Sequence, residues 1–539
     1  MDQAAATKLM SEAELAGMSA AELATLARSQ GKAIEELAQQ LAQAIHRIEW
    51  FERQLFGTKS ERLKVLQNTQ QLSLGEELGS TPTQEETPAE ERTVAAHKRR
   101  RARSAAAAEA QGESVPFFDE KRVPVQTIPV PNPDADGLSA DEYDVIGEKV
   151  TYRLAQRPGS YVVLKYVRPV IKRIDTQTIS APPAPQGVLE DSRADVSFLA
   201  GLITEKLDYY LPLNRQHRRM KDNGISVTRQ WMTQLFQRSA GLLEPIYDSQ
   251  FDSIIASRVK TMDETTIKAG LKGPGKMRTG YFWPVYGDRD EVCFPFFPSR
   301  GGDCILAALG TTHPAGSVLL TDGYAPYASY AKQVGIINAQ CWSHSRREFV
   351  EAQNADPEGV LEALQRIGAI YEIETQIRDL GLEGDAKRQY RQLHSKPLVG
   401  AFFTWVDWRI LQHRLRPATP FTRALHYVHE RRAGLEVFLS DPAVPLDTNH
   451  LERVLRPIPM GRKNYLFCWT ETGARQIGII QSLISTCRLH DIDVYTYLVD
   501  VLQRVGVHPA SRVAELTPRL WKKHFASNPL RSVVHTLGP

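Results

Sequence analysis

Several features of membrane and secreted proteins are missing from this sequence. No apolar run approaches the ~20 residues that a membrane-spanning helix requires. The N-terminal stretch MDQAAATKLMSEAEL carries acidic residues where a signal peptide has an apolar core. The five cysteines are widely spaced and form no C-x-x-C pair, which argues against a disulfide framework and a four-cysteine zinc site. We therefore expect a cytoplasmic protein.

Net charge is also nearly absent. The 539 residues include 66 basic and 63 acidic side chains, a balance of +3. Bulk charge therefore favours no class of partner, and a nucleic-acid surface has to come from local clusters. The composition, 42% hydrophobic and 24% charged, is that of a globular protein, and the length predicts about three to five domains.

The N-terminal region shows three successive patterns. Between Ile34 and Leu55, apolar residues recur at alternating steps of three and four, which predicts a dimerising coiled coil within residues 1–66; a helix packed on its own protein is the alternative. Residues 67–120 lose this periodicity and contain the basic run Lys98–Arg103, as in a flexible linker whose basic arm holds phosphates or is simply solvated. Strand-like alternation between residues 145 and 180 predicts a strand-rich module at 121–187.

Residues 188–250 have the pattern of a helix-turn-helix. A helix is predicted over Asn214–Asn223, Gly224 interrupts it, and Ser226 offers an N-cap for a second helix, Val227–Arg238. A generic helical hairpin has a similar pattern. If this region binds DNA, the candidate contacts are its cations, namely Arg215, Arg218, Arg219, Lys221 and Arg229.

Residues 251–355 follow the order β-β-β-α-β-α-β-α. The predicted strands are Ser257–Asp263, Gly280–Gly287, Glu291–Pro298, Ser317–Asp322 and Ile336–Trp342. The predicted helices are Gly301–Leu309, Tyr324–Gln333 and a basic helix from Ser345. Three antiparallel strands followed by a crossover to a strand beside the first describe an RNase H-like core, so the fold class is α/β. Helical patterns follow, which we assign to an insertion (356–440), the last part of the core (441–490) and a C-terminal segment (491–539).

Three acids are candidates for catalysis. Asp263 and Asp322 end the first and fourth strands, which this order makes neighbours, so their carboxylates should meet at one sheet edge. Glu452 falls in the first turn of a helix capped by Thr448 or Asn449 and is the best third acid. Carboxylates in such a group suit two-metal phosphoryl transfer with Mg²⁺.

Other interpretations of the acids remain open. Glu264 is an alternative first acid and Asp447 an alternative third. Each aspartate can instead be an ordinary loop or cap residue, and Glu452 can pair with Arg456 one helical turn away.

Cations lie close to these acids in the sequence. His344, Arg346 and Arg347 follow the fifth strand, and Arg453, Arg456, Arg462 and Lys463 follow Glu452, a density suited to DNA phosphates. His344 either contacts DNA or supports the acids. Cys341 and His344 resemble half of a zinc site that has no second half, so we do not expect zinc.

Together these motifs resemble the insertion-sequence 66 family of bacterial DDE transposases. The matching stretches are Met262–Thr265, Thr321–Tyr327, Cys341–Phe349 and the spacing Asp447-x-Asn449-x-x-Glu452-Arg453, in consistent order over nearly the whole chain. The resemblance implies a triad of Asp263, Asp322 and Glu452 and Mg²⁺ as cofactor, with Mn²⁺ as a substitute.

The resemblance also implies partners and a location. It implies binding of terminal inverted repeats and target DNA, a homo-oligomer of at least two subunits, two small accessory proteins of the same element, no membrane association, and a nucleoid-associated protein of the bacterial cytoplasm. Similar members usually carry a cysteine zinc module ahead of the helix-turn-helix. The equivalent span here, roughly 135–180, contains no cysteine.

We therefore expect a DNA transposase that cuts the ends of an insertion sequence and joins them to target DNA by two-metal phosphoryl transfer. The alternatives are a catalytically inactive DNA-binding regulator derived from a transposase and a metal-dependent nuclease of the same fold that performs no strand transfer.

Overall fold

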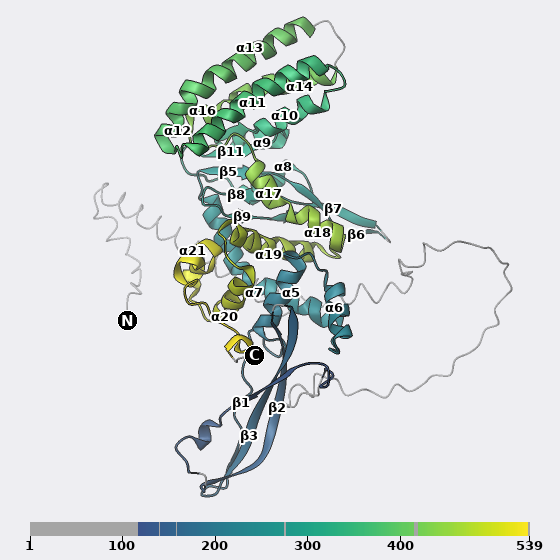
Figure 1. Cartoon of the computed structure of the whole chain (residues 1–539), viewed down its shortest axis with the longest axis vertical. Coiled ribbons are helices and arrows are strands. Elements are labelled where there is room, and N and C mark those ends of the chain that lie inside the picture. Colours follow the sequence, from purple (N-terminus) through teal and green to yellow (C-terminus); the bar gives the residue numbers. More distant parts are fainter. Residues whose placement is uncertain (1–116, 140, 158, 274–275, 414–418, 537–539) are drawn as a thin grey trace, which may run out of the picture. The chain divides into compact units, whose positions relative to one another are not determined.

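The computed structural model describes residues 117–536, apart from residues 140, 158, 274–275 and 414–418 (Figure 1). The predicted coiled coil between Ile34 and Leu55 and the basic run Lys98–Arg103 lie outside the described residues. None of the described helices is long and apolar enough to cross a membrane.

The first sheet is built on a long β-hairpin. β2 (Tyr143–Arg157) pairs antiparallel with β3 (Ser160–Arg173). β1 (Val125–Pro129) lies parallel to β3 on its other side, and the two-residue β4 (Ile179–Ser180) also pairs with β3. The strands expected between residues 145 and 180 are confirmed, and the pairing adds β1, which the sequence pattern did not reveal.

Three helices follow this sheet. α5 (Val196–Leu207) precedes α6 (Leu213–Asp222) and α7 (Arg229–Ile255), and α6 and α7 contact one another. The first predicted helix is confirmed within one residue. The second was predicted too short, because α7 continues to Ile255 and so runs past the proposed boundary at residue 250.

The predicted N-cap of the second helix was wrong. Thr228 caps α7, since its side chain accepts a hydrogen bond from Trp231 N at 3.1 Å. Ser226 instead donates its backbone N–H to Phe117 O at 2.9 Å, next to a β-bridge between Phe118 and Ile225. This long-range pairing keeps the chain extended at Ser226 and delays the helix by two residues.

The second sheet has five strands in the order β12-β11-β5-β8-β9. Its strands are β5 (Val259–Met262), β8 (Val285–Tyr286), β9 (Val292–Cys293), β11 (Val318–Thr321) and β12 (Ile337–Gln340). β5, β8 and β9 are antiparallel neighbours, and β11 is parallel to both β5 and β12. This is the order expected for an RNase H-like core.

The predicted strand Gly280–Gly287 was wrong, because the chain divides there between two sheets. β7 (Lys276–Phe282) pairs with β6 (Thr265–Gly273) and β10 (Phe296–Phe297) in a separate three-stranded sheet. The chain crosses between the sheets at Trp283 and Pro284, where the indole is buried and the proline has no N–H for a strand ladder. The predicted strand Glu291–Pro298 divides in the same way into β9 and β10, and β6 was missed altogether.

Helices α8 (Gly302–Leu309), α9 (Ala325–Val334) and α10 (Trp342–Glu351) follow the expected order. α10 begins three residues before the predicted start at Ser345. Trp342 is fully buried at its first position, and the indole Nε1 donates to Leu435 O at 2.9 Å. The helix start is therefore anchored by a contact with a distant segment.

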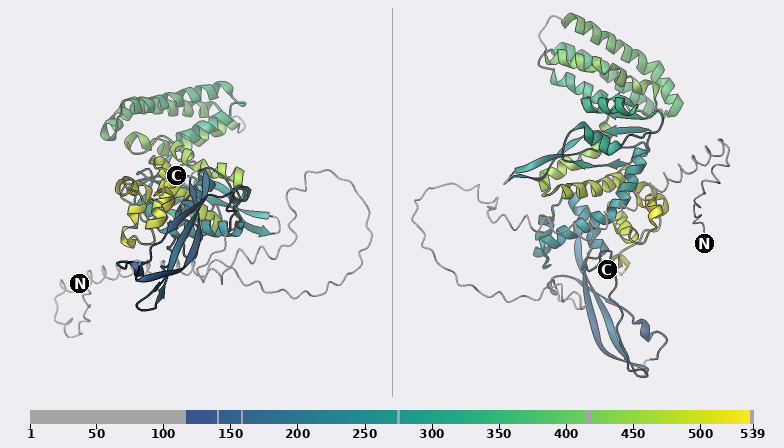
Figure 2. Two further views of the ribbon diagram at one scale, coloured as in Figure 1. Left: turned by 60° about the horizontal axis from the view of Figure 1, so that its bottom comes forward. Right: turned by 180° about the vertical axis from the view of Figure 1, so that it is seen from behind.

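A helical insertion occupies residues 357–440, as the sequence predicts. Its elements are α11 (Pro357–Asp379), α12 (Gly384–Tyr390), a π-helical turn η3 (Arg391–Ser395), α13 (Lys396–His413), α14 (Pro420–Glu430), α15 (Arg432–Leu435) and α16 (Val437–Ser440). These green helices lie side by side in Figures 1 and 2. They enclose an aromatic core in which the Trp342 and Phe402 rings meet edge to face at 5.4 Å.

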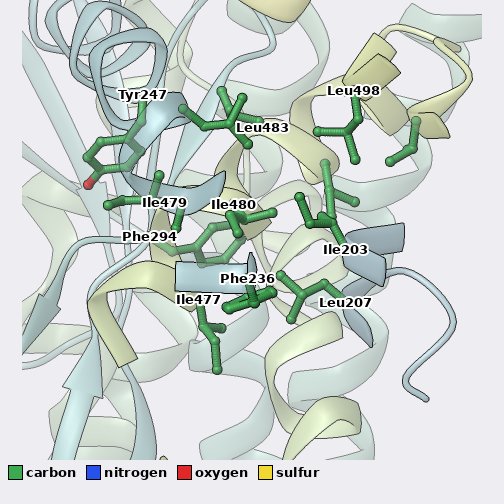
Figure 3. Packing of buried hydrophobic residues seen from close by; sticks show 14 of the residues in the cluster. Ile203, Leu207, Phe236, Tyr247, Phe294, Ile477, Ile479, Ile480, Leu483 and Leu498 are labelled. Atoms are coloured by element: carbon green, nitrogen blue, oxygen red, sulfur yellow. The ribbon is translucent and has the colours of Figure 1, made fainter. Parts of the chain in front are cut away.

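The last helices close the core. They are α17 (Asn449–Leu455), α18 (Pro457–Tyr465), α19 (Glu471–Leu489), α20 (Val494–Arg504), α21 (Pro518–His524) and α22 (Val533–Thr536). α19 is buried along most of its length against α5, α7 and β9. Figure 3 shows Ile480 and Leu483 of α19 among Ile203, Phe236 and Phe294, which belong to the same hydrophobic cluster. This packing joins the helical region before the core to the sheet.

Candidate active site

Asp263 and Asp322 lie next to each other at one edge of the five-stranded sheet. The parallel register of β5 and β11 pairs Thr261 with Leu320, so each aspartate stands two residues beyond a paired position on neighbouring strands. Both side chains are half-buried. The register therefore brings together the two acids that the strand order predicted to be neighbours.

The two carboxylates interact electrostatically. Burial raises the pKa of Asp263 to about 7, and the charges of Glu264 and Asp322 add to this effect; a hydrogen bond from Glu264 N and the charge of His344 oppose it. Negative charge at this edge is thus only partly compensated by the protein. A bound divalent cation would relieve it, and carboxylate oxygens are the ligands such a cation prefers.

Glu264, the alternative first acid, is occupied by protein donors. Its side chain is only 4% exposed. Arg300 Nε donates to Oε1 at 2.7 Å and the Tyr327 hydroxyl donates to Oε2 at 2.8 Å. Both oxygens are therefore engaged, which favours Asp263 over Glu264 as a metal ligand. Arg300 and Tyr327 were not identified from the sequence, since they are 36 and 63 positions away from Glu264.

Glu452 faces α10. His344 Nε2 and an Arg347 nitrogen lie 3.7 Å and 3.5 Å from its Oε1, whereas the alternative pairing with Arg456 is not the one adopted. Asp447, the alternative third acid, caps the helix instead, since its Oδ1 accepts from Asn449 N at 3.0 Å. Thr448 occupies the N-cap position of α17 without a side-chain capping bond, which departs from the expected role of Thr448 or Asn449.

His344 connects the third acid to the aspartates. Burial disfavours its charged form, but the neighbouring Cys341 and the charge of Asp322 raise its pKa. A cationic imidazole near Asp322 and Glu452 supports the acids, one of the two predicted roles. Within the described residues, no three His, Cys, Asp or Glu side chains already form a metal-binding group.

Cys341 has a structural contact that its sequence motif did not suggest. The buried sulfur lies 3.3 Å from both the backbone nitrogen and the hydroxyl of Thr448. It thereby ties the end of β12 to the start of α17. This contact, rather than a zinc ion, accounts for its burial beside His344.

The predicted DNA-binding cations fall into two groups. Most are exposed, namely Arg215, Arg218, Lys221, Arg229, Arg346, Arg347, Arg453, Arg456 and Lys463. Arg219 instead pairs with Glu205 and donates to the Tyr161 hydroxyl at 2.7 Å, and Arg462 donates to the Thr266 hydroxyl at 2.6 Å. These two guanidinium groups are engaged within the protein.

The strand order and the paired aspartates at its edge place this protein in the RNase H-like class. Residues 191–476, more than half of the chain, match the family described as "Transposase IS66 family". Residues 482–519 match its "IS66 C-terminal element", and residues 43–110 match the "Transposase C of IS166 homeodomain". The chain belongs to the IS66 family of DDE transposases.

Curated relatives extend over nearly the same length. Three uncharacterized proteins of Sinorhizobium fredii are similar to this chain. Protein y4hP is 30% identical, over 89% of each chain. Protein y4qI is 28% identical over 94% of this chain and 93% of its own, and y4jD is 26% identical over 91% and 96%. The family implies a phosphoryl-transfer enzyme that binds DNA and uses a divalent metal.

Proposed function

We propose that this transposase cleaves the ends of its insertion sequence and joins them to target DNA, with Asp263, Asp322 and Glu452 as the catalytic acids. The observation that carries the proposal is the pair of aspartates on β5 and β11, whose charges are felt by one another. Glu452 contacts His344, which in turn senses Asp322. The three acids thus belong to one connected group.

The donor set fits Mg²⁺, with Mn²⁺ as a substitute. Asp263 and Asp322 offer hard oxygen ligands in a half-buried position, and Glu452 would complete the set by turning from His344 and Arg347. Such ions supply Lewis-acid activation of the attacking and leaving oxygens in phosphoryl transfer. The chemistry requires no Ser or Tyr nucleophile, so we expect no covalent protein–DNA intermediate.

The remaining chain would position DNA. Arg346, Arg347, Arg453, Arg456 and Lys463 surround Glu452 and are exposed, as phosphate contacts must be. We assign recognition of the terminal inverted repeats to α6 and α7 within residues 188–250, and pairing of two subunits to the coiled coil within residues 1–66. Accessory proteins of the same element remain proposed partners.

A cleavage and joining assay tests the proposal. It uses the full chain, Mg²⁺, DNA carrying the ends that flank its gene, and the variants Asp322→Asn and Asp379→Asn. Asp379 lies exposed at the end of α11 and serves as the matched control. We expect joined DNA from wild type and Asp379→Asn, and DNA binding without any product from Asp322→Asn.

Two other results identify the alternatives. DNA binding by wild type without product, in Mg²⁺ or Mn²⁺ and with accessory proteins added, would identify a regulator derived from a transposase. Cleavage without joined product would identify a nuclease of the same fold. A fully active Asp322→Asn variant would refute the assigned triad.

A further inference from the structure

The β6–β7 hairpin is a basic ribbon that begins beside the aspartates. β6 starts at Thr265, two residues after Asp263. Residues 265–282 contain Lys268, Lys272, Lys276 and Arg278 and no acidic residue. All four cations are exposed.

The charge on this ribbon is largely uncompensated. In the described part of the chain, no carboxylate lies within ion-pair distance of Lys272 or Lys276, and Lys268 donates to the Thr279 hydroxyl at 2.6 Å. Arg278 meets Glu471 at 3.7 Å, with both side chains solvent-exposed, a weak pair. A polyanion is the partner that such a surface fits.

An apolar platform runs along the same ribbon. Cys468 N donates to Lys268 O at 2.8 Å and Gly270 N donates to Cys468 O at 3.1 Å, so this segment lies as an extra edge beside β6. Cys468 is buried, while Phe467 and Trp469 meet edge to face at 5.0 Å. Trp469 is 53% exposed. A large aromatic surface is thus offered to solvent between cations.

The platform is continuous with the catalytic helices. α17 carries Glu452, and α18 leads directly into the platform. Arg462 at the end of α18 donates to Thr266 at the base of β6. Because a strand rises about 3.3 Å per residue, Lys268 lies roughly 17 Å along the chain from Asp263. A DNA strand leaving the aspartates would reach the platform within a few nucleotides.

We propose that the β6–β7 ribbon and the Phe467–Trp469 platform bind single-stranded DNA, which rests on the proposed function in taking DNA as the substrate. The ribbon cations hold the phosphates and Trp469 stacks on an unpaired base. A B-form duplex offers base edges and phosphates, so an exposed indole face finds a stacking partner only where a strand is unpaired. Aromatic side chains between cations are typical of surfaces that bind single strands.

The first test compares two DNA probes by fluorescence anisotropy in the absence of divalent metal. The probes are fluorescein-labelled oligo(dT) and a blunt duplex of the same length, with the full chain as Trp469→Ala, Trp469→Phe and Trp408→Ala. Trp408 is 50% exposed on α13 and is the matched control. We expect Trp469→Ala to weaken oligo(dT) binding about tenfold, with duplex binding unchanged, and Trp469→Phe to restore most of the affinity.

A direct probe of stacking covers the case in which other cations dominate affinity. A duplex with an unpaired tail carries 2-aminopurine in the tail, and its fluorescence is read on binding. Stacking on Trp469 should quench it in wild type and Trp408→Ala but not in Trp469→Ala. Equal quenching in all three proteins would overturn the proposal.

The ribbon is tested by the salt dependence of oligo(dT) binding. Each lost phosphate contact on a single strand lowers the slope of log affinity against log salt by about 0.7. The pair Lys272→Ala with Lys276→Ala should therefore lower the slope by about 1.4. The control pair Lys332→Ala with Lys523→Ala, exposed on α9 and α21, should leave it unchanged. An unchanged slope in the ribbon variant would contradict the proposed phosphate contacts.

These measurements separate the two proposals. Binding needs no catalysis, so a Trp469 effect without any joined DNA from wild type would support the single-strand site and refute the transposition activity. Joined DNA from wild type, with binding and stacking unaltered in Trp469→Ala, would refute the single-strand site alone.

Discussion

Replacing Arg391 by methionine should loosen the helical insertion. Arg391 is fully buried in the π-helical turn, where its guanidinium makes two hydrogen bonds to Glu374, both at 2.8 Å. It also donates to the backbone oxygens of Phe438 at 2.8 Å and Val444 at 3.0 Å. The arginine therefore joins α11 to the segment that leads from α16 towards α17.

The size of the effect follows from burial. The Glu374 side chain is 16% exposed, so the Arg391→Met variant leaves a carboxylate with little water and without its cation. Removing one partner of a buried ion pair costs about 3–5 kcal/mol. Since every 1.4 kcal/mol is about tenfold, local opening of α11 and α13 should become at least about a hundredfold more frequent.

Hydrogen exchange of the α11 and α13 amides measures this opening. Arg388→Met is the matched control, because Arg388 is 46% exposed and pairs with an exposed aspartate; its effect should stay within about 0.5 kcal/mol. In the double variant Arg391→Met with Glu374→Gln, the loss should be smaller than the sum of the single losses, since no charge is left buried. Equal exchange in Arg391→Met and Arg388→Met would refute the reasoning.

Two further variants test the packing and the electrostatics of the core. Gly478→Ala should destabilise the protein by about 1–3 kcal/mol in urea unfolding, because a Cβ there would meet the Phe294 backbone oxygen; Gly368→Ala, with no neighbour within 4 Å on α11, should be neutral or stabilising, and the reverse order would refute the packing argument. Burial lowers the pKa of Lys260 to about 8, so between pH 8 and about 10.5 the unfolded chain holds a proton that the folded chain has released. The stability of wild type relative to Lys260→Met should therefore rise with pH across this window, and a flat difference would contradict the assigned pKa.

Features of the core with a local cause were predictable. β11 and β5 are short apolar runs that end in an acid, and α8 and α9 lie close to their predicted ranges. The order of these elements was enough to predict which strands are neighbours, because crossovers between parallel strands obey topological rules. The pairing of Asp263 with Asp322 follows from that order.

Features with a distant cause were not predictable. β6 was missed because its bulge at Gly270, with φ of +71°, exists through pairing with β7 and interrupts the two-residue period. The start of α7 shifts because residue 117 holds Ser226 extended. The basic ribbon and its platform, which carry the single-strand proposal, therefore became visible only in the structure.

By itself, the sequence determined the strand order, the two aspartates at neighbouring strand ends and the resemblance to the transposase family, because periodicity and motif spacing are properties of the chain. Only the tertiary structure decided between rival acids. Glu264 and Asp263 are adjacent in sequence, yet Arg300 and Tyr327 engage both oxygens of Glu264. Which carboxylate remains open to a metal depends on side chains brought from elsewhere by folding.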